Sequence, residues 1–494
     1  MNIQNALISV FYKDGLEVLV NILREKNIGI YSTGGTAKFI EESGGSVHHV
    51  EDLTGFPSIF GGRVKTLHPA VFGGILYRRE NVEDVAQAKE FNIPALDLIV
   101  VDLYPFEETL KSGGSPQEII EKIDIGGVSL IRAAAKNFAS TLVVCDKADY
   151  AKAAELIAQN KVDIATRKAF AAKAFKVTQA YDELIGAYLA GEQEYSLRYG
   201  ENPHQKASFR GNMDENFTQI QGKEISYNNL LDIEAAMALV GDFDANNGAT
   251  FAIIKHNNAC GIATRSKVED AYSAALAADP VSAFGGIMIC NHPIDLPTAH
   301  QIDKIFFEIL LAPEFGAGVT ELFAKKANRI LLKIHSFSMS AIQKRTLLNG
   351  QLIQERDTLM EKSSSFRPVT LLTASQSQLS DLEFALKVVK HTKSNAIVLV
   401  KDGQLLASGT GQTSRVDALN QAIAKAGHFG FDLNGSVMAS DAFFPFPDCV
   451  EIGAAAGVKA IVQPGGSVKD HLSIDAANKL GVAMVFTGNR HFKH

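Results

Sequence analysis

The sequence predicts an α/β protein with more than one domain, and three observations carry that prediction. Its 494 residues exceed what a single hydrophobic core normally supports, so two or three domains are expected. In the first third of the chain, short apolar segments alternate with amphipathic ones, which is typical of parallel strands joined by crossover helices. The second half has a weak internal echo: residues 253–256 (Ile-Ile-Lys-His) are answered by 388–391 (Val-Val-Lys-His), and 279–284 loosely by 440–445. We therefore expect an N-terminal parallel sheet followed by two similar α/β subdomains.

The composition excludes several classes of protein. The apolar, charged and aromatic fractions of 46%, 21% and 8% are those of an ordinary globular chain without a disorder signature. The formal net charge is −7 and the basic residues are dispersed, which argues against a general nucleic-acid or membrane-surface binder but leaves room for local anion sites. No stretch is long enough for a membrane span, and residues 1–4 lack the layout of a signal peptide, so we expect a cytoplasmic protein.

The cysteines predict no metal site. Cys145, Cys260, Cys290 and Cys449 are far apart, and neither a Cys-x-x-Cys pair nor a histidine spacing typical of zinc is present. Reduced thiols are the expected state. Cys260 lies beside a polar cluster, which makes a nucleophilic role the alternative, but nothing in the sequence indicates a depressed pKa for its thiol.

The first part of the chain gives the clearest element pattern. Strands are predicted over residues 6–10, 28–31 and 98–103, and helices over 16–23 and 36–42. The second strand runs into residues 32–37 (Ser-Thr-Gly-Gly-Thr-Ala), a small, hydroxyl-rich turn that opens a helix. Backbone N–H groups of such a turn bind phosphate well. The alternative is a simple connection between strand and helix.

Further along, titratable groups stand at the ends of elements. Residues 63–69 (Arg-Val-Lys-Thr-Leu-His-Pro) place two cations and an imidazole on one loop, which suits an anionic substrate. Tyr104 follows a buried-type strand, and Asp124 precedes a helix that carries Lys136. Taken singly, a core aromatic and a helix-capping carboxylate are the better explanations of Tyr104 and Asp124.

One long helix is predicted over residues 163–189, because Phe170, Ala174 and Tyr181 fall along a single face. The residues after it, 191–194 (Gly-Glu-Gln-Glu), break the helix, and we place a domain boundary near Gly191. The polar, turn-rich string that follows favours a substrate loop over a linker. With a second boundary between residues 349 and 367, the expected domains are 1–190, 191–360 and 361–494.

The stretch from residue 249 to residue 258 is the candidate reaction centre of the second half. A short apolar strand is predicted over 249–254, and Lys255 and His256 arrive with two amides where it ends. Ligands bind at the carboxyl ends of strands in open α/β sheets, and a lysine tunes the charge state of a neighbouring histidine. For this string alone, a solvated strand end followed by an Asn-rich turn is the simpler alternative.

The last sixty residues carry a second group of candidates. Residues 441–448 place aromatic faces beside carboxylates, which can stack on and hydrogen-bond a flat, nitrogen-rich ring. The terminal residues 487–494 follow an apolar strand over 482–486 and contain Arg490, His491 and Phe492. That content favours a docked tail over a frayed one.

Taken together, these motifs resemble a known family. The motifs are residues 63–69, 123–127 (Ile-Asp-Ile-Gly-Gly), 197–205 (Leu-Arg-Tyr-Gly-Glu-Asn-Pro-His-Gln), Lys255-His256, 440–446 (Ser-Asp-Ala-Phe-Phe-Pro-Phe) and Arg490-x-Phe492. In this order, over essentially the whole chain, they resemble the bifunctional purine-biosynthesis enzymes that join phosphoribosylaminoimidazolecarboxamide (AICAR) formyltransferase to inosine monophosphate (IMP) cyclohydrolase. The resemblance implies a methylglyoxal-synthase-like domain and then two cytidine-deaminase-like subdomains, of which the zinc signature is missing here.

The resemblance implies formyl transfer in the second half. The 5-amino group of AICAR attacks 10-formyltetrahydrofolate, a co-substrate and not a tightly bound cofactor, and gives the formylated product FAICAR. Proton removal is assigned to His256, proton delivery or charge stabilisation at the departing folate nitrogen to Lys255, and the oxyanion to Asn395. Substrate-binding positions in this half are Arg198, Tyr199, Glu308, Arg415, Phe443, Asp448, Arg490 and Phe492. At Glu308 the family often has a shorter acid.

The resemblance implies that the first half closes FAICAR to IMP with loss of water, a step that needs mainly positioning and proton transfer. The matching catalytic positions are Lys65, Tyr104, Asp124 and Lys136, and the substrate-binding positions are Ser9, Lys13, Thr33, Gly34, Gly35, Thr36, Arg63 and Thr66. A homodimer is also implied, with transformylase sites that draw groups from both chains.

The sequence departs from the family pattern in two places, and two alternative functions remain. Phe11 and Tyr12 stand where small hydroxyl and acidic residues are commoner, and Ala259 stands where a proline is usual; loss of that proline frees a backbone φ near His256. A chain that only binds ribotides is one alternative, against which the joint presence of the catalytic types argues. An enzyme with one activity is the other, and the cyclohydrolase is the half that Phe11 and Tyr12 put in question.

Overall fold

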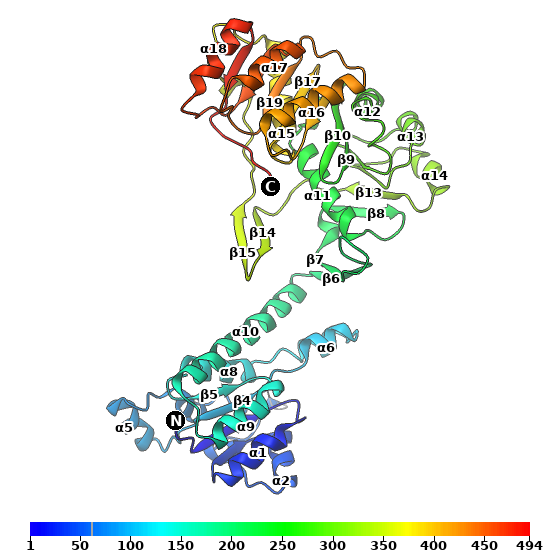
Figure 1. Cartoon of the computed structure of the whole chain (residues 1–494). Coiled ribbons are helices and arrows are strands. Elements are labelled where there is room, and N and C mark those ends of the chain that lie inside the picture. The colour runs from blue at the N-terminus through cyan, green and yellow to red at the C-terminus, as the bar shows by residue number, and fades with distance from the viewer. Residues whose placement is uncertain (61–62) are drawn as a thin grey trace. The chain divides into compact units, whose positions relative to one another are not determined.

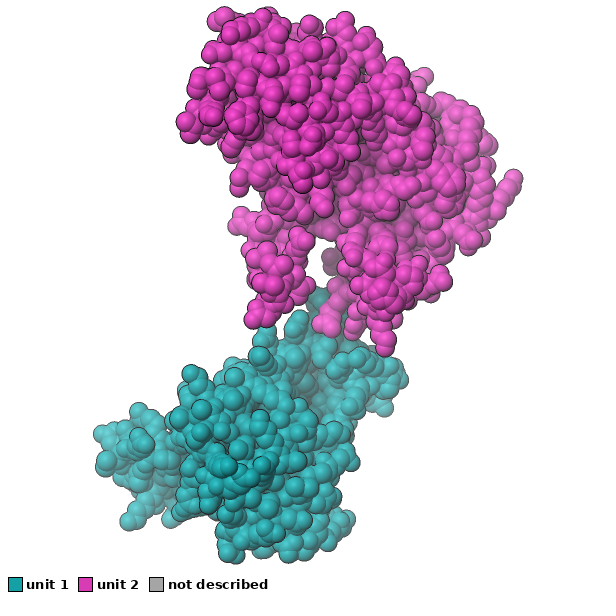
Figure 2. Space-filling view, in the orientation of Figure 1, with its two compact units in different colours: residues 1–193 teal, residues 194–494 magenta. Residues whose placement is uncertain are grey.

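The computed structural model describes residues 1–60 and 63–494, which form two compact units, Met1–Gln193 and Glu194–His494 (Figure 2). We call them unit 1 and unit 2. Each has its own hydrophobic cores. No helix in the described part of the chain is long and apolar enough to cross a membrane.

Unit 1 contains a parallel sheet among helices (Figure 1). Its strands are β1 (Asn5–Ser9), β2 (Gly29–Ser32), β3 (His48–His49), β4 (Leu98–Val101) and β5 (Leu142–Val144). Its helices are α1 (Leu16–Glu25), α2 (Gly34–Glu42), α3 (Val50–Thr54), α4 (Pro69–Leu76), α5 (Val82–Glu90), α6 (Phe106–Lys111), α7 (Pro116–Ile120), α8 (Gly126–Lys136), α9 (Tyr150–Ala158) and α10 (Ile164–Leu189). The parallel sheet predicted from the sequence is confirmed.

The strand order β3-β2-β1-β4-β5 determines where a ligand can bind. The chain first forms β2 and β3 on one side of β1 and then crosses to form β4 and β5 on the other side. The connections after β1 and β4 therefore run in opposite directions and leave a crevice at the carboxyl ends of these two strands.

The long helix α10 agrees with the sequence pattern. Asp163 caps its N-terminus by accepting a hydrogen bond from the backbone N–H of Thr166 at 2.7 Å. Phe170, Ala174 and Tyr181 are buried, as the periodicity predicted.

Unit 2 is built on a larger, mixed sheet. Its strands are β6 (Gln193–Leu197), β7 (Ala207–Gly211), β8 (Phe217–Gln221), β9 (Ala249–Lys255), β10 (Asn258–Arg265), β11 (Ile287–Cys290), β12 (Ile309–Ala312), β13 (Ile330–Ile334), β14 (Ile342–Leu347), β15 (Gly350–Glu355), β16 (Arg367–Pro368), β17 (Ile397–Lys401), β18 (Gln404–Gly409), β19 (Val437–Ser440), β20 (Ala460–Gln463) and β21 (Ala483–Phe486). Its helices are α11 (Tyr227–Gly241), α12 (Val268–Ala277), α13 (Leu296–Ile302), α14 (Val319–Ala324), α15 (Gln376–Lys390), α16 (Arg415–His428), α17 (Asp448–Ala456) and α18 (Asp470–Leu480). The hairpin β14–β15 projects from the body of the unit (Figure 1).

The large sheet is a structural duplication. In the described residues its strand order is β16-β21-β20-β19-β17-β18-β10-β9-β11-β12-β13-β8. From either edge to the middle, the strands have the same arrangement. Each half has an antiparallel hairpin at the centre, three parallel strands beyond it and an antiparallel edge strand. The halves join where β10 pairs with β18.

The sequence echo identified the duplication in the wrong register. Residues 388–391 do not lie on a strand; they end α15, and the structural counterpart of β9 is β17. Likewise 279–284 follow a helix, whereas 440–445 follow a strand. One core runs across both halves on the α11 and α15 face of the sheet, so residues 194–494 are one compact unit, and the boundary near residue 360 stays a prediction.

Candidate active sites

A cavity of about 720 Å³ lies in unit 1 at the carboxyl ends of β1, β2 and β4, at the crevice set by the strand order. Ten residues predicted for the cyclohydrolase line it: Ser9, Lys13, Thr33, Gly35, Thr36, Arg63, Lys65, Thr66, Tyr104 and Asp124. They come from five separate segments of the sequence, which only the fold brings together.

One side of this cavity suits an anion. Gly34 opens α2 with a φ of 53°, and a Cβ atom built on it would lie 3.5 Å from Lys65 Nζ. The Lys65 ammonium therefore lies over the N-terminus of α2, which has no side-chain cap. Two sources of positive potential at one point favour a phosphate or carboxylate there.

Several polar groups beside this point are already used within the protein. Thr36 Oγ1 donates to the Val10 carbonyl at 2.9 Å and accepts from its N–H at 3.1 Å. Thr33 Oγ1 donates to Glu51 at 2.7 Å, and Lys13 Nζ donates to the carbonyls of Val10 and Phe11. These side chains shape the loop after β1, so a ligand meets mainly the backbone N–H groups of α2 and Lys65.

Phe11, one of the two aromatic residues that depart from the family pattern, lines the same cavity, and Tyr12 packs against its ring. The backbone N–H groups of Phe11 and Tyr12 both donate to the carboxylate of Asp102. This directs the Phe11 ring edge-to-face onto Tyr104, with ring centroids 5.9 Å apart. Burial raises the pKa of Asp102 despite these bonds and the nearby charge of Lys13.

Asp124 and Tyr104 form the proton-transfer side of the cavity. Asp124 is buried and accepts a hydrogen bond from the N–H of Gly127 at 2.7 Å. Burial raises its pKa, with a further contribution from Asp102, while the Gly127 and Tyr104 N–H groups and the charge of Lys65 oppose the rise. Burial and then the charges of Asp124 and Asp102 raise the pKa of the Tyr104 phenol. A carboxyl with raised pKa beside a protonated phenol is suited to general acid and base work.

In unit 2 the predicted residues gather at one end of the large sheet. Lys255 pairs with Asn258 in the first half, and Ile397 pairs with both Gly409 and Ser440 in the second. The antiparallel pairing of Ala263 with Gln404 joins the halves and brings Asn258 level with Gly409, so these residues share one end of the sheet. The parallel strands β20 and β21 end on the same side. The predicted residues at this end are Lys255, His256, Glu308, Asn395, Arg415, Phe443, Asp448, Arg490 and Phe492.

Lys255 and His256 lie at a tight hairpin between β9 and β10. His256 and Asn257 have φ values of 51° and 64°, as the two central residues of a type I′ turn require. Asp232 of α11 accepts from the Asn257 N–H at 2.6 Å, and Lys255 Nζ donates to the Phe284 carbonyl at 2.9 Å. The His256 side chain is exposed, so the turn presents the imidazole to solvent while α11 holds its backbone.

Asn395 is held by Arg415. Arg415 Nη2 donates to Asn395 Oδ1 at 2.9 Å, and its Nη1 donates to Ser440 and Asp441. Because an arginine only donates, the contact fixes which end of the amide is the oxygen. The Asn395 Nδ2 group donates to the carbonyls of Gln412 and Thr413 at 3.0 and 3.3 Å.

The C-terminal tail docks between the β9–β10 turn and the segment that carries Asn395, which confirms the prediction of a docked tail. Lys493 and Ser394 exchange two hydrogen bonds, of 2.9 and 3.0 Å. Lys493 Nζ donates to the carbonyls of His391 at 2.9 Å and Asn257 at 3.5 Å, and burial lowers its pKa. A cavity of about 450 Å³ reaches this place and is lined in part by Asn257, Phe492 and Lys493.

Comparison with known proteins decides the family. The model of the AICARFT/IMPCHase bienzyme matches residues 134–425, and that of the MGS-like domain matches residues 15–129. The chain belongs to the AICARFT/IMPCHase bienzyme family. It is a bifunctional enzyme of purine biosynthesis, an AICAR formyltransferase and IMP cyclohydrolase for the last two steps to IMP.

The relatives match over their whole length. A bifunctional purine biosynthesis protein PurH of Bacteroides thetaiotaomicron is 52% identical over 504 residues, with 100% of this chain and 99% of the relative covered. The proteins of the same name from Acetivibrio thermocellus and Aquifex aeolicus are 45% and 44% identical, with 99% or more of each chain covered. Among solved structures, one titled "Crystal structure of ForH" is 32% identical, covers 37% of this chain and 95% of its own, and has a TM-score of 0.33.

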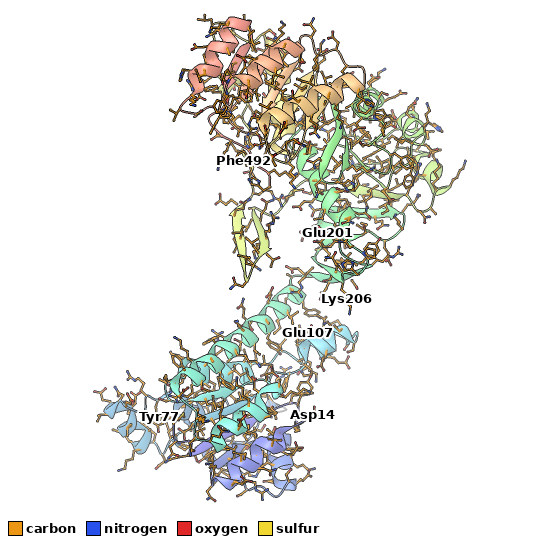
Figure 3. All side chains as sticks on the ribbon, in the orientation of Figure 1. Asp14, Tyr77, Glu107, Glu201, Lys206 and Phe492 are labelled. Carbon is orange, nitrogen blue, oxygen red and sulfur yellow. The ribbon has the colours of Figure 1, made fainter. Side chains whose placement is uncertain are left out.

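Not every position that the family resemblance suggested lies with its partners. Lys136 is in the last turn of α8 and lines a separate cavity of about 650 Å³ with Arg132 and Lys168, away from Lys65 and Asp124. Arg198 and Tyr199 follow β6, where the guanidinium lies 5.5 Å from the Tyr199 ring centroid. In Figure 3, Glu201 of the same loop is well apart from Phe492.

Two other family positions are engaged in local contacts. Glu308 forms an ion pair with Lys223 at 2.6 Å, and Asp448 accepts from the N–H of Cys449 at 2.8 Å as α17 begins. Ala259, where the family often has proline, pairs with Ile254 inside the hairpin. The contacts that hold the turn therefore lie elsewhere, at Asp232.

Residues missed by the sequence analysis are mainly carboxylates that orient the site, of which Glu361 is buried, Asp102 and Asp232 are half-buried and Asp357 is exposed. Asp102, Asp232, Asp357 and Glu361 carry no distinctive spacing, and each contacts residues far away in sequence. For Asp102 alone a signal existed, since it is a carboxylate inside the otherwise apolar strand predicted over residues 98–103.

The cysteines and the acidic residues offer no further chemistry of their own. All four cysteines are buried, and burial raises the pKa of the Cys260 thiol to about 11, which disfavours a thiolate nucleophile. Among the described residues, no group of three or more His, Cys, Asp or Glu side chains is placed to hold a metal ion.

Proposed function

We propose that formyl transfer takes place at the Lys255–His256 end of the large sheet, and that FAICAR closes in the cavity of unit 1. The observation that carries the first assignment is the strand register, which aligns the β9–β10 turn with the beginning of β17 and the end of β19. The cavity at the β1/β4 crevice supports the second.

Formyl transfer needs a base, an acid and an oxyanion donor. The 5-amino group of AICAR attacks the formyl carbon of 10-formyltetrahydrofolate, and its lone pair is weakened by delocalisation into the ring. In our proposal His256 accepts the proton that this nitrogen loses, and Lys255 delivers a proton to the departing folate nitrogen. The exposed His256 ring at a rigid turn supports this role, because the base must reach a bound substrate.

Asn395 stabilises the negative oxygen of the tetrahedral intermediate in this proposal. Arg415 holds Oδ1 of the Asn395 amide, so Nδ2 is the end of the amide that donates hydrogen bonds. The weaker of its two bonds, at 3.3 Å to the Thr413 carbonyl, is the one that an oxyanion would replace. Arg490 and Phe492 of the docked tail bind the ribotide.

Ring closure is proposed to use Asp124, Tyr104 and Lys65. The carboxamide nitrogen of FAICAR forms a bond to the formyl carbon and loses a proton to Asp124, whose raised pKa makes it a better acceptor. The formyl oxygen takes up this proton from Asp124 and becomes a hydroxyl. Tyr104 protonates that hydroxyl as the C–O bond breaks and water leaves, and the former formamide nitrogen returns its proton to Tyr104. Lys65 and the N-terminus of α2 hold the phosphate. Phe11 lies where its ring can pack against the base of the ligand.

Three further assignments stay predictions. These are 10-formyltetrahydrofolate as the formyl donor, a cytoplasmic location, and a homodimer whose transformylase sites take groups from both chains. The isolation of Arg198 and Tyr199 from Phe492 within one chain supports the shared site. Light scattering in solution tests the homodimer, and a monomeric mass would contradict it.

One assay tests both activities. The purified protein is given AICAR and 10-formyltetrahydrofolate, and FAICAR and IMP are followed over time. We expect FAICAR to appear transiently and IMP to accumulate. FAICAR that accumulates without IMP would contradict the cyclohydrolase assignment, and absence of both would contradict the formyl donor.

A further inference from the structure

His491 is a buried histidine between two carboxylates, and neither proposed reaction uses it. Only 3% of the residue is exposed. Its Nδ1 lies 2.6 Å from Asp357 Oδ2, and its Nε2 lies 3.1 Å from Glu361 Oε2. A neutral imidazole has one N–H group, whereas an imidazolium has two. Two bonds to carboxylates therefore require the protonated ring.

The same histidine joins the tail to the proposed ribotide site. Its backbone N–H donates to the Asp441 carbonyl at 3.0 Å, and the side chain of Asp441 accepts from Arg415. Asn489 Nδ2 adds a bond of 3.0 Å to Glu361. The neighbours of His491 in sequence, Arg490 and Phe492, are the tail residues proposed to bind substrate.

We propose that His491 is a positioning residue for formyl transfer. As an imidazolium it fixes the tail to the segment that carries Asp357 and Glu361, and so holds Arg490 and Phe492 in place for the ribotide. Loss of its proton removes one of the two bonds, leaves a carboxylate unpaired and loosens the tail. The inference rests on the proposed function in one respect, the binding of ribotide by the tail.

The direction of the pH effect follows from the groups around the ring. Burial alone lowers the pKa of His491, but the bonds to Glu361 and Asp357 and the charges of those groups outweigh it, so the pKa is raised. Asp357 and Glu361 are the charged groups that contact the ring, and Asp441 faces it through its backbone. With a raised pKa, the contact is complete at pH values below the ordinary histidine pKa of about 6.5 and is lost as the pH rises through the higher pKa in the folded protein.

The test measures the KM for AICAR in the formyl-transfer step from about pH 6 to about pH 9, a range that brackets the titration of a histidine with raised pKa. In the wild-type protein we expect this KM to be constant at the acidic end and to rise at the alkaline end, with kcat less affected. His491→Gln should raise the KM about tenfold at about pH 6 and abolish the pH-dependent rise, because a charge-assisted contact is lost. A KM for His491→Gln that equals the wild-type value, or that still rises with pH, would overturn the proposal.

A second variant keeps the histidine and moves its titration. Glu361→Gln removes one of the two carboxylates that raise the pKa of His491, so the alkaline rise in KM should begin at a lower pH. An unchanged midpoint would overturn the proposal. His471→Gln, at an exposed position of α18, is the matched control and should behave as wild type.

Two controls separate the possible failures. Cyclisation of added FAICAR takes place in unit 1 and should be unchanged in every variant, which shows that the effect is confined to unit 2; the thermal unfolding of unit 2 reports on its folding. Arg490→Ala tests the underlying assignment. If Arg490→Ala leaves the KM for AICAR unchanged, the tail does not bind the ribotide; if it raises the KM while the histidine variants do not, His491 has no positioning role.

Discussion

Each proposed centre depends on titratable side chains whose environments differ. In unit 1, Asp124 is buried and Tyr104 stands at the exposed edge of the same cavity, and partial burial raises both pKa values. In unit 2, His256 stands exposed on a turn, and the half-buried side chain of Lys493 contacts that turn. The proposed base of cyclisation is therefore already shielded from water, whereas formyl transfer depends on substrate binding to cover the imidazole.

At the scale of single residues, substitutions at the two centres should have opposite effects. His256→Ala removes the proposed base and should lower the rate of formyl transfer by about 10² to 10⁴-fold, the usual contribution of a general base. Cyclisation of added FAICAR should remain intact. Lys65→Ala should give the reverse pattern. Each rate is measured separately, by FAICAR formation and by IMP formation.

Equal loss of both activities in either variant would indicate misfolding and not loss of a catalytic group. Formyl transfer at a near wild-type rate in His256→Ala would exclude this residue as the base.

At the scale of elements, the duplicated halves share a device that holds a turn. In the first half, Asp232 of α11 accepts from the Asn257 N–H of the β9–β10 turn. In the second half, Asp381 of α15 accepts from the N–H groups of Asp402 and Gly403, in the β17–β18 turn, at 2.9 and 2.7 Å. The counterpart of the Lys255–His256 pair is thus Lys401–Asp402. The β9–β10 turn carries an imidazole, and the β17–β18 turn does not. In our proposal the first turn takes part in catalysis, whereas the second has a structural role.

This pair of aspartates provides a matched experiment. Asp232→Ala should loosen the turn that carries His256 and lower kcat of formyl transfer about tenfold, the loss expected for one buried hydrogen bond to a carboxylate. Asp381→Ala removes the equivalent bonds at the other turn and should leave kcat within about twofold of wild type. Thermal unfolding checks that both variants lose a similar amount of stability. Equal effects on kcat would show that Asp232 acts only through overall stability.

At the scale of the whole molecule, the two centres lie in separate compact units. In the proposed assignment, FAICAR made in unit 2 must reach the cavity of unit 1, and the residues proposed for the two centres do not overlap. Each unit therefore needs only a complete site of its own and a supply of its substrate.

A mixing experiment follows from this separation. His256→Ala and Lys65→Ala should each fail to convert AICAR to IMP, but a mixture of the two should form IMP after a lag, since FAICAR released by one protein is cyclised by the other. The lag should shorten as the amount of His256→Ala is increased. FAICAR that builds up in the mixture without IMP would show that the intermediate does not pass between molecules.

Local pattern was enough for much of the fold. The α10 periodicity, the strand before Lys255 and the alternation of strands and helices in unit 1 are properties of neighbouring residues, and the structure agrees with them. The similarity between residues 253–256 and 388–391 did not identify equivalent elements, because one of these segments lies on a strand and the other at the end of a helix. The true repeat is one of topology and turn geometry, which short apolar strings do not encode.

By itself the sequence determined the family and the two reactions, because those depend on motifs a few residues long. Only the tertiary structure decided which residues meet: the register that brings Asn258 level with Gly409, the cavity at the β1/β4 crevice, and the carboxylates at Asp232 and around His491. It also placed Lys136 in a cavity separate from that of Lys65 and Asp124. The physical reason is that contact between residues 25 to 141 positions apart arises from strand pairing and helix packing, which are set by the whole core and not by any local string.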